Sequence, residues 1–130
     1  MSWAGSPYFT KQEMLCKCGK CGLLPLDSFM LKLVTLRERA GFPFVISSGA
    51  RCAKHNAAVS NTGSEGPHVM QRAVDVKVYG ERAFNLVALA TTHGFTGIGV
   101  SQKGPHEKRY IHLDDLDVGG KHPRKTIWSY

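Results

Sequence analysis

The chain has 130 residues, and its 17 lysines and arginines exceed its 10 aspartates and glutamates, for a formal charge of +7. This length is typical of a single domain, predicted over residues 1–130, and suffices for a hydrophobic core without a staple. No apolar run approaches the ~20 residues of a membrane span. The first residues lack the basic start and hydrophobic stretch of a secretory signal peptide, so we expect synthesis in a cytoplasm.

The net positive charge suits nucleic acid, anionic lipid or an acidic polymer such as a bacterial cell wall. The basic residues are dispersed, however, and no block of five like charges forms a nucleic-acid-binding arm. We therefore expect no nucleic-acid partner, and a steep salt dependence of DNA binding would contradict this expectation.

Helical and strand patterns follow one another along the chain. A capping box from Thr10 to Glu13 predicts a helix that starts at Lys11. Asp27 is predicted to cap a second helix, which ends at Gly41. The later elements are predicted as a strand at 44–48, a strand at 73–78, a helix at 81–93 and strands at 97–100 and 109–113. This pattern predicts one α+β domain.

Two further segments have no regular pattern. The polar stretch from Gly49 to Gly66 is predicted to be a loop, and loops of this length in small domains tend to be functional. The tail from Asp117 to Tyr130 ends in large apolar groups. We therefore expect the tail to fold back onto the body of the domain.

Four cysteines are present, three of them in a C-x-C-x-x-C cluster: Cys16, Cys18, Cys21 and Cys52. They could hold a structural zinc ion, remain free thiols in a reducing cytosol, or contain one disulfide after release from the cell. We favour a structural role over a catalytic thiol.

A second group of metal-ligating residues lies on predicted strands. Asp75 lies on the strand face opposite the valines of its strand, and His68 precedes that strand. His112 shares a strand face with Tyr110 and Asp114. Two imidazoles and one carboxylate can form a zinc site that leaves a fourth position open for water, which is the chemistry of hydrolysis. On spacing alone, the aspartate could equally pair with a lysine and the histidines could be hydrogen-bonded rather than ligated.

Three ordered motifs resemble a known family. The first runs from Ser48 to Cys52 (SGARC) and is followed by His55-Asn56, the second is GPHVMQRAVD at 66–75, and the third is YIHLDD at 110–115. They resemble the zinc D-Ala-D-Ala carboxypeptidases and phage L-alanyl-D-glutamate endopeptidases (LAS metallopeptidases), relatives of lysostaphin-type enzymes and of the hedgehog signalling domain. The opening and ending of the chain also resemble small phage or prophage members, so the resemblance spans nearly the whole chain.

The resemblance implies a hedgehog-like fold, with a small antiparallel sheet and helices packed on one side. It also implies zinc as the cofactor, with His68, Asp75 and His112 as its ligands. Arg51 would bind a carboxylate or carbonyl of the substrate through its planar fork. Ser48 would orient the substrate or cap the turn after its strand, and we favour the turn.

The sequence departs from the family pattern at several positions. Gln71 stands where the family usually has glycine, and Ala50 replaces a common aromatic residue. Arg109 stands three residues before the last ligand, where many members place the Glu or Asp that acts as general base. An arginine stays charged and cannot accept a proton. It could instead stabilise an oxyanion or grip the substrate, or simply be solvated.

Three residues near the last ligand could replace the missing base. We expect His106 to act as the catalytic base, because an imidazole suits acid–base work near neutral pH. Glu107 is the second choice. Asp114 is the third, although it could equally be a partner that orients a ligand imidazole.

The leading hypothesis is a monomeric zinc peptidase that hydrolyses a bond in the peptide stem of bacterial peptidoglycan. The bond would be L-Ala–D-Glu or of the D-Ala–D-Ala type. The enzyme would be a phage or prophage endolysin that accumulates in the host cytoplasm and acts on the cell wall after release. The alternative is a zinc-containing module that binds the cell wall without peptidase activity, which the arginine at position 109 favours.

Overall fold

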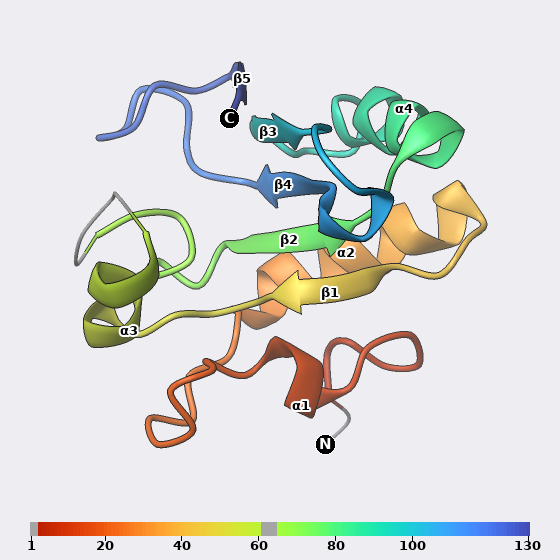
Figure 1. Ribbon diagram of the computed structural model, residues 1–130. Coiled ribbons are helices and arrows are strands. Elements are labelled where there is room, and N and C mark those ends of the chain that lie inside the picture. Colours follow the sequence, from red (N-terminus) through yellow and green to blue (C-terminus); the bar gives the residue numbers. More distant parts are fainter. Residues whose placement is uncertain (1–2, 61–64) are drawn as a thin grey trace.

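Five strands form one sheet in the order β1-β2-β4-β3-β5 (Figure 1). The structure is a computed structural model that describes residues 3–60 and 65–130. Neighbouring strands pair antiparallel, except that β5 runs parallel to β3. The elements in chain order are α1 (Lys11–Met14), α2 (Asp27–Ala40), β1 (Val45–Ser48), α3 (Ala53–Val59), β2 (Ala73–Lys77), α4 (Gly80–Ala90), β3 (Gly97–Ser101), the short 3-10 helix η1 (His106–Lys108), β4 (Tyr110–Asp114) and β5 (Thr126–Ser129).

The hydrophobic core lies between one face of the sheet and the two longest helices. Figure 1 shows α2 and α4 behind the sheet, on the same side of it. Both helices bury apolar residues at helical spacing, and the strands contribute alternate aliphatic residues from the face of the sheet that is turned toward the helices. The central core residues are Phe29, Leu33, Leu36, Val74, Val76, Leu86, Ile98, Ile111 and Leu113. The predicted α+β fold, with helices on one side of a mostly antiparallel sheet, is confirmed.

The opposite face of the sheet carries polar groups. In β2, Val74 and Val76 point into the core, so Asp75 between them points to the other face. In β4, Ile111 and Leu113 are in the core, and the intervening His112 is on the face of Asp75. The predicted alternation of both strands is confirmed, and it places the polar residues away from the helices.

The ends of the first two helices follow local sequence signals, with one exception. Thr10 forms the predicted capping box with Glu13, and Gly41 ends α2 in the left-handed conformation with φ of 76°. The expectation that Asp27 caps α2 is wrong, because Leu26 occupies the cap position and no side chain caps the helix. Asp27 is instead in the first turn, where its negative charge interacts favourably with the positive end of the helix dipole.

Two segments without a regular pattern in the sequence contain a helix or a strand. The stretch predicted as a loop from Gly49 to Gly66 contains α3, and its residues 61–64 lie outside the described residues. The tail folds back as expected and adds β5 to the edge of the sheet beside β3. No helix among the described residues is long and apolar enough to cross a membrane.

Candidate functional site

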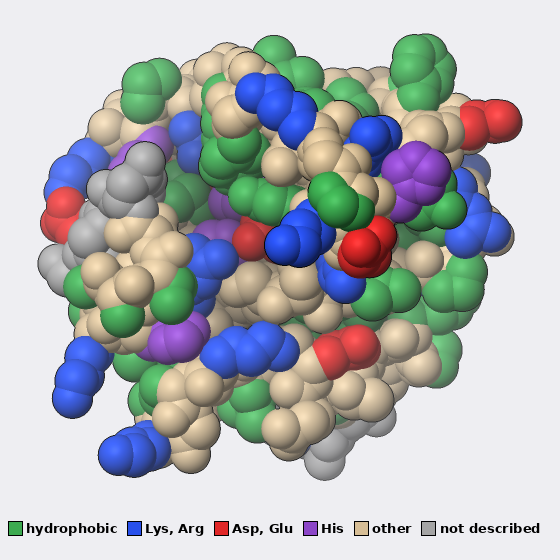
Figure 2. All heavy atoms as spheres, viewed as in Figure 1, with side chains coloured by type: hydrophobic (Ala, Val, Ile, Leu, Met, Phe, Trp, Pro, Cys, Tyr) green, Lys and Arg blue, Asp and Glu red, His purple; other side chains and the backbone are tan. Residues whose placement is uncertain are grey.

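A pocket of about 580 Å³ opens on the polar face of the sheet. Figure 2 shows a hollow on this face, in which histidine and acidic side chains lie among basic and apolar ones. The pocket is lined by Arg51, Val59, Ser60, Pro67, His68, Asp75, Tyr110, His112, His122, Arg124, Trp128 and Tyr130. The predicted metal ligands and Arg51 are therefore together in one cavity.

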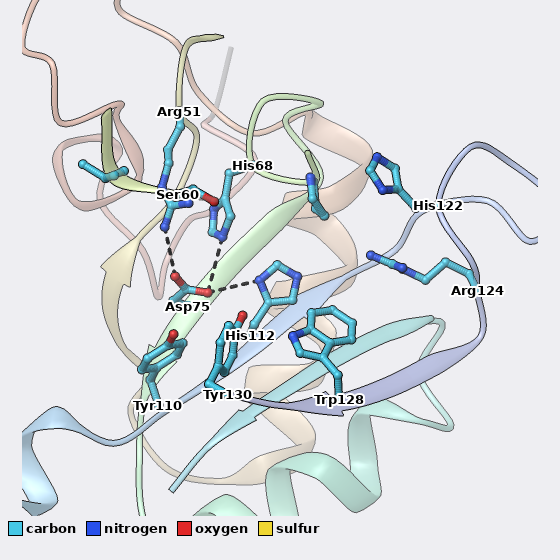
Figure 3. Close-up of a pocket in the computed structure, with 12 residues that line it drawn as sticks. Arg51, Ser60, His68, Asp75, Tyr110, His112, His122, Arg124, Trp128 and Tyr130 are labelled. Carbon is cyan, nitrogen blue, oxygen red and sulfur yellow. Dashed lines mark hydrogen bonds and ion pairs between the residues drawn. The ribbon is translucent and has the colours of Figure 1, made fainter. Parts of the chain in front are cut away.

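The three predicted metal ligands meet at the base of this pocket (Figure 3). Asp75 Oδ1 is 3.3 Å from His68 Nε2 and 3.2 Å from His112 Nδ1. Asp75 and His112 are direct partners across the β2–β4 pair, whereas His68 comes from the loop before β2. One ligand atom from each side chain lies within 4.8 Å of the other two, which is close enough for a single ion to contact all three.

Both imidazoles are held by the nitrogen that faces away from this cluster. His68 Nδ1 is 2.7 Å from the carbonyl oxygen of Gly49, and His112 Nε2 is 2.7 Å from Asp114 Oδ2. When a histidine donates one ring N–H to an oxygen, its tautomer is fixed and the lone pair of the other nitrogen is free for a metal. The contacts therefore direct His68 Nε2 and His112 Nδ1 toward Asp75.

Asp114 is itself held by an arginine from the tail. Arg124 Nε donates to Asp114 Oδ1 at 2.8 Å and Nη2 donates to Oδ2 at 2.7 Å. The backbone of Gly97 on β3 passes so close that a Cβ atom there would overlap the Asp114 carboxylate. Of the two roles that the sequence left open for Asp114, its contacts match the partner that orients a ligand imidazole.

The ionisation of this cluster follows from burial and hydrogen bonding. Burial raises the pKa of Asp75, but the close contacts with the imidazoles of His112 and His68 outweigh it, so the pKa is well below its usual range. The same competition, with His112 and Arg124 as donors, lowers the pKa of Asp114 to about 2. Burial lowers the pKa of His112, but the two carboxylates beside it raise the pKa overall. The cluster thus keeps both aspartates ionised, as metal ligation and its support require.

Arg51 supports the cluster from the end of β1. The register of β1 against β2 shifts between Ile46 and Ser48, and this bulge brings Ser48 opposite Asp75. Arg51 donates from Nε to Ser48 Oγ at 3.1 Å and from Nη2 to Asp75 Oδ2 at 3.2 Å. Its Nη1 donates to Oδ1 of the buried Asn56 on α3 at 3.2 Å. Ser48 contacts the arginine and is not among the residues that line the pocket.

Aromatic residues from the tail form another wall of the pocket. The ring centroids of Trp128 and His112 are 5.1 Å apart, and those of Tyr130 and Tyr110 are 5.4 Å apart. Figure 3 shows His122 and Arg124 extending from the segment before β5 beside Trp128. Sequence reasoning did not include these tail residues in the site. The signals for them were the expected folding back of the tail and the resemblance of the end of the chain to small phage members.

The first two residues predicted to supply the base, His106 and Glu107, lie outside the pocket, as does Arg109. His106 is exposed on η1 and stacks on Tyr79 with the ring centroids 4.2 Å apart, and Glu107 beside it is exposed. Arg109 donates from Nε to the carbonyl oxygen of Gly104 at 3.0 Å. None of these three residues lines the pocket. Among the described residues that do, Asp75 is the only carboxylate.

The departure at Gln71 does not change the backbone that a glycine would favour. Gln71 has a φ of 63°, in the left-handed region, and its side chain donates to the carbonyl oxygen of Leu24 at 2.8 Å. Its own backbone N–H donates to the carbonyl oxygen of His68 at 3.2 Å. The turn after His68 therefore keeps its shape with a residue that is strained there.

The donor set at the base of the pocket fits zinc. Two imidazole nitrogens and one carboxylate oxygen are the ligands of many catalytic zinc sites, which leave one position open. The three side chains are nearly buried, with 4%, 8% and 3% of the surface of His68, Asp75 and His112 exposed. Each is oriented by a further contact, and the pocket opens beside them.

Comparison with known protein families gave a match over most of the chain. Residues 7–114 match the model of the family described as Peptidase M15, and the match includes all three candidate ligands, Arg51 and Asp114. A comparison with curated proteins gave no match.

Proposed function

The chain belongs to the peptidase M15 family, a family of metallopeptidases, and we propose that it is a zinc peptidase that hydrolyses a bond in the peptide stem of bacterial peptidoglycan. The observation that carries the proposal is the cluster of His68, Asp75 and His112, which lies at the base of an open pocket with each side chain held by a second partner.

His68 Nε2, a carboxylate oxygen of Asp75 and His112 Nδ1 would hold the ion. Zinc in such a site activates a water molecule and polarises the carbonyl of a scissile bond. The chain's contribution is to fix the ligands before the ion arrives. Gly49 and Asp114 hold the two imidazoles, and Arg51 holds the second oxygen of Asp75.

The charge of the pocket supports a substrate with carboxylates, as a peptide stem has. Arg51 uses three of the five N–H donors of its guanidinium within the protein, which leaves others for a substrate carboxylate or carbonyl. Arg124 and His122 line the same pocket, and Asp75 is the only acidic residue among its described lining. The aromatic wall of Trp128 and Tyr130 offers apolar contact to the stem.

Hydrolysis also needs a group that takes a proton from water. His106, and then Glu107, remain the candidates from the sequence. His122 is a further candidate, because it is an imidazole that lines the pocket and is not one of the three ligands. Tyr110 and Tyr130 are neutral hydroxyl donors suited to the developing oxyanion, since burial raises the pKa of both phenols.

The proposal extends to the bond and the setting. The bond is L-Ala–D-Glu or of the D-Ala–D-Ala type, because a shallow pocket that binds carboxylates suits either. A role as a phage or prophage endolysin is supported by the resemblance of both ends of the chain to small phage members.

The test is mass spectrometry of purified peptidoglycan after incubation with the protein, with and without a chelator. We expect stem fragments that disappear with the chelator and with His68→Ala, and their masses identify the bond. His93→Ala is the matched control, because His93 contacts the carbonyl oxygen of Leu89 and does not line the pocket. Cleavage that persists in a folded His68→Ala protein would overturn the proposal.

The second candidate function is a zinc-containing module that binds the cell wall without cutting it. Two observations favour it: an arginine at position 109, and a pocket whose only described carboxylate is the candidate ligand Asp75. Protein that holds zinc and sediments with cell walls, but releases no new amino termini from them, would decide for this function.

A further inference from the structure

A second cluster of metal-ligating side chains lies apart from the pocket. The sulfur atoms of Cys16, Cys18, Cys21 and Cys52 all lie within 4.8 Å of one another. A tetrahedral zinc site with Zn–S bonds of about 2.3 Å has sulfur atoms about 3.8 Å apart. The four sulfurs are therefore near the spacing that one zinc ion requires, although Cys52 is 31 residues beyond Cys21 in the sequence.

Each sulfur also accepts a backbone N–H. Cys18 Sγ accepts from Lys20 and Cys21, both at 3.4 Å, and Cys21 Sγ accepts from Leu23 at 3.5 Å. Cys16 Sγ accepts from the N–H of Cys52 itself at 3.2 Å. Cys52 Sγ, at the start of α3, accepts from His55 at 3.5 Å. Such N–H donors stabilise the negative charge of a thiolate, the form in which cysteine binds zinc.

The surroundings of the cluster fit a structural site rather than a catalytic one. Cys16 is buried, Cys18 and Cys52 are half-buried, and Cys21 is exposed. All four are free thiols. Four thiolates fill every position of a tetrahedral ion, so no position is left for water or a substrate. None of the four lines the pocket that holds the histidines.

We propose that these four cysteines bind one structural zinc ion, separate from the ion of the pocket. The ion joins the irregular segment between α1 and α2 to the start of α3. This junction matters because Cys52 directly follows Arg51, whose side chain contacts Asp75. The zinc site thus fixes the backbone from which the arginine of the pocket extends.

The test measures zinc content, so it is independent of peptidase activity. The wild-type protein and its variants are loaded with zinc and freed of excess metal. Native mass spectrometry then measures the number of zinc ions bound to each chain. We expect two zinc ions per chain in the wild type, one in His68→Ala, one in the double variant Cys18→Ser/Cys21→Ser, and none in the combined variant. Lys20→Ala is the matched control and should keep both ions, because it removes a side chain of the same turn and leaves the backbone donor.

A second measurement uses only the His68→Ala chain, in which all four thiols are intact. Loaded with cobalt, it should show the intense visible absorption of a tetrahedral thiolate site. With zinc bound, the exposed Cys21 should resist alkylation until a chelator is added. The proposal is overturned if this chain holds no metal or if Cys21 reacts equally with and without chelator. It is also overturned if the intact mass is two hydrogens below that of the fully reduced chain, which would show that cysteines have formed a disulfide.

Discussion

Arg124 donates two parallel hydrogen bonds to the carboxylate of Asp114, at 2.8 and 2.7 Å, from a part of the chain that sequence reasoning left out of the site. Asp114 is fully buried and contacts His112 through the same oxygen that accepts from Arg124 Nη2. The tail therefore acts on the proposed metal site through a carboxylate, without being a ligand itself. The pairing leads to the first two predictions.

Removing the charge of Asp114 should weaken metal binding. In Asp114→Asn the partner of His112 Nε2 loses its charge, and we expect the zinc affinity of the pocket to fall about 10- to 100-fold. Competition with a coloured chelator measures the affinity, and circular dichroism checks the fold. Asp117→Asn is the matched control, because Asp117 is exposed and pairs with Arg72. Equal affinities of the two variants would contradict the orienting role of Asp114.

A methyl group on Gly97 should disturb the same contact from the other side. The Cβ of Gly97→Ala would overlap the Asp114 carboxylate and lie 2.5 Å from Arg124 Nε. We expect a loss of about 1–3 kcal/mol in the free energy of unfolding, typical of overpacking, together with weaker zinc binding. Urea denaturation measures the first effect. Gly120→Ala, whose Cβ would meet only a carbonyl oxygen at 3.3 Å, should change neither property.

Replacing Arg51 with lysine should separate its charge from its shape. A lysine keeps the positive charge but cannot contact Ser48, Asn56 and Asp75 with a planar fork. We expect kcat/KM on peptidoglycan fragments to fall at least about tenfold, with zinc content unchanged. Arg109→Lys, outside the pocket, should retain the wild-type value. A full kcat/KM in Arg51→Lys would show that charge alone suffices at this position.

The proton acceptor can be identified by comparing two histidines. We expect His122→Ala to lower kcat by about 10²–10⁴-fold, because His122 lines the pocket, and His106→Ala to have little effect, because His106 stacks on Tyr79 outside it. The choice of His106 from the sequence predicts the reverse order. Zinc content must remain equal in both variants for the comparison to report on proton transfer.

The left-handed backbone at Gln71 should affect the free energy of unfolding of variants at this position. An alanine there would keep the strain of a φ of 63° and lose the hydrogen bond to Leu24. A glycine would lose the same bond but relieve the strain. We therefore expect Gln71→Gly to be about 1 kcal/mol more stable than Gln71→Ala in urea denaturation. Equal stabilities would mean that the turn relaxes around the alanine.

The part of the site that could be predicted from the sequence is the part that local rules determine. Strand alternation is sufficient to place Asp75 and His112 away from the core, and the motif around His68 indicates the third ligand. The wall formed by Arg124 and Trp128 could not be found in this way. It depends on the parallel pairing of β5 with β3, which joins residues 29 positions apart, such as Gly97 and Thr126, and leaves no local pattern.

Adjacency in sequence was also a poor guide to adjacency in space. His106 and Glu107 are close to His112 along the chain, but they belong to η1, where both are exposed, His106 stacks on Tyr79, and neither lines the pocket. The short helix α3 was missed because its seven residues lie inside a polar stretch without an apolar stripe.

The pairing of Asp75 with His112 across β2 and β4 has a consequence for folding. A slip of one residue between these strands would turn Asp75 into the core, and a slip of two would set it opposite Tyr110 or Asp114. Only one alignment brings Asp75 and His112 side by side at the base of the pocket. An ion bound there would stabilise this alignment over its neighbours, so the proposed zinc would favour the correct register of the sheet in addition to its role in hydrolysis.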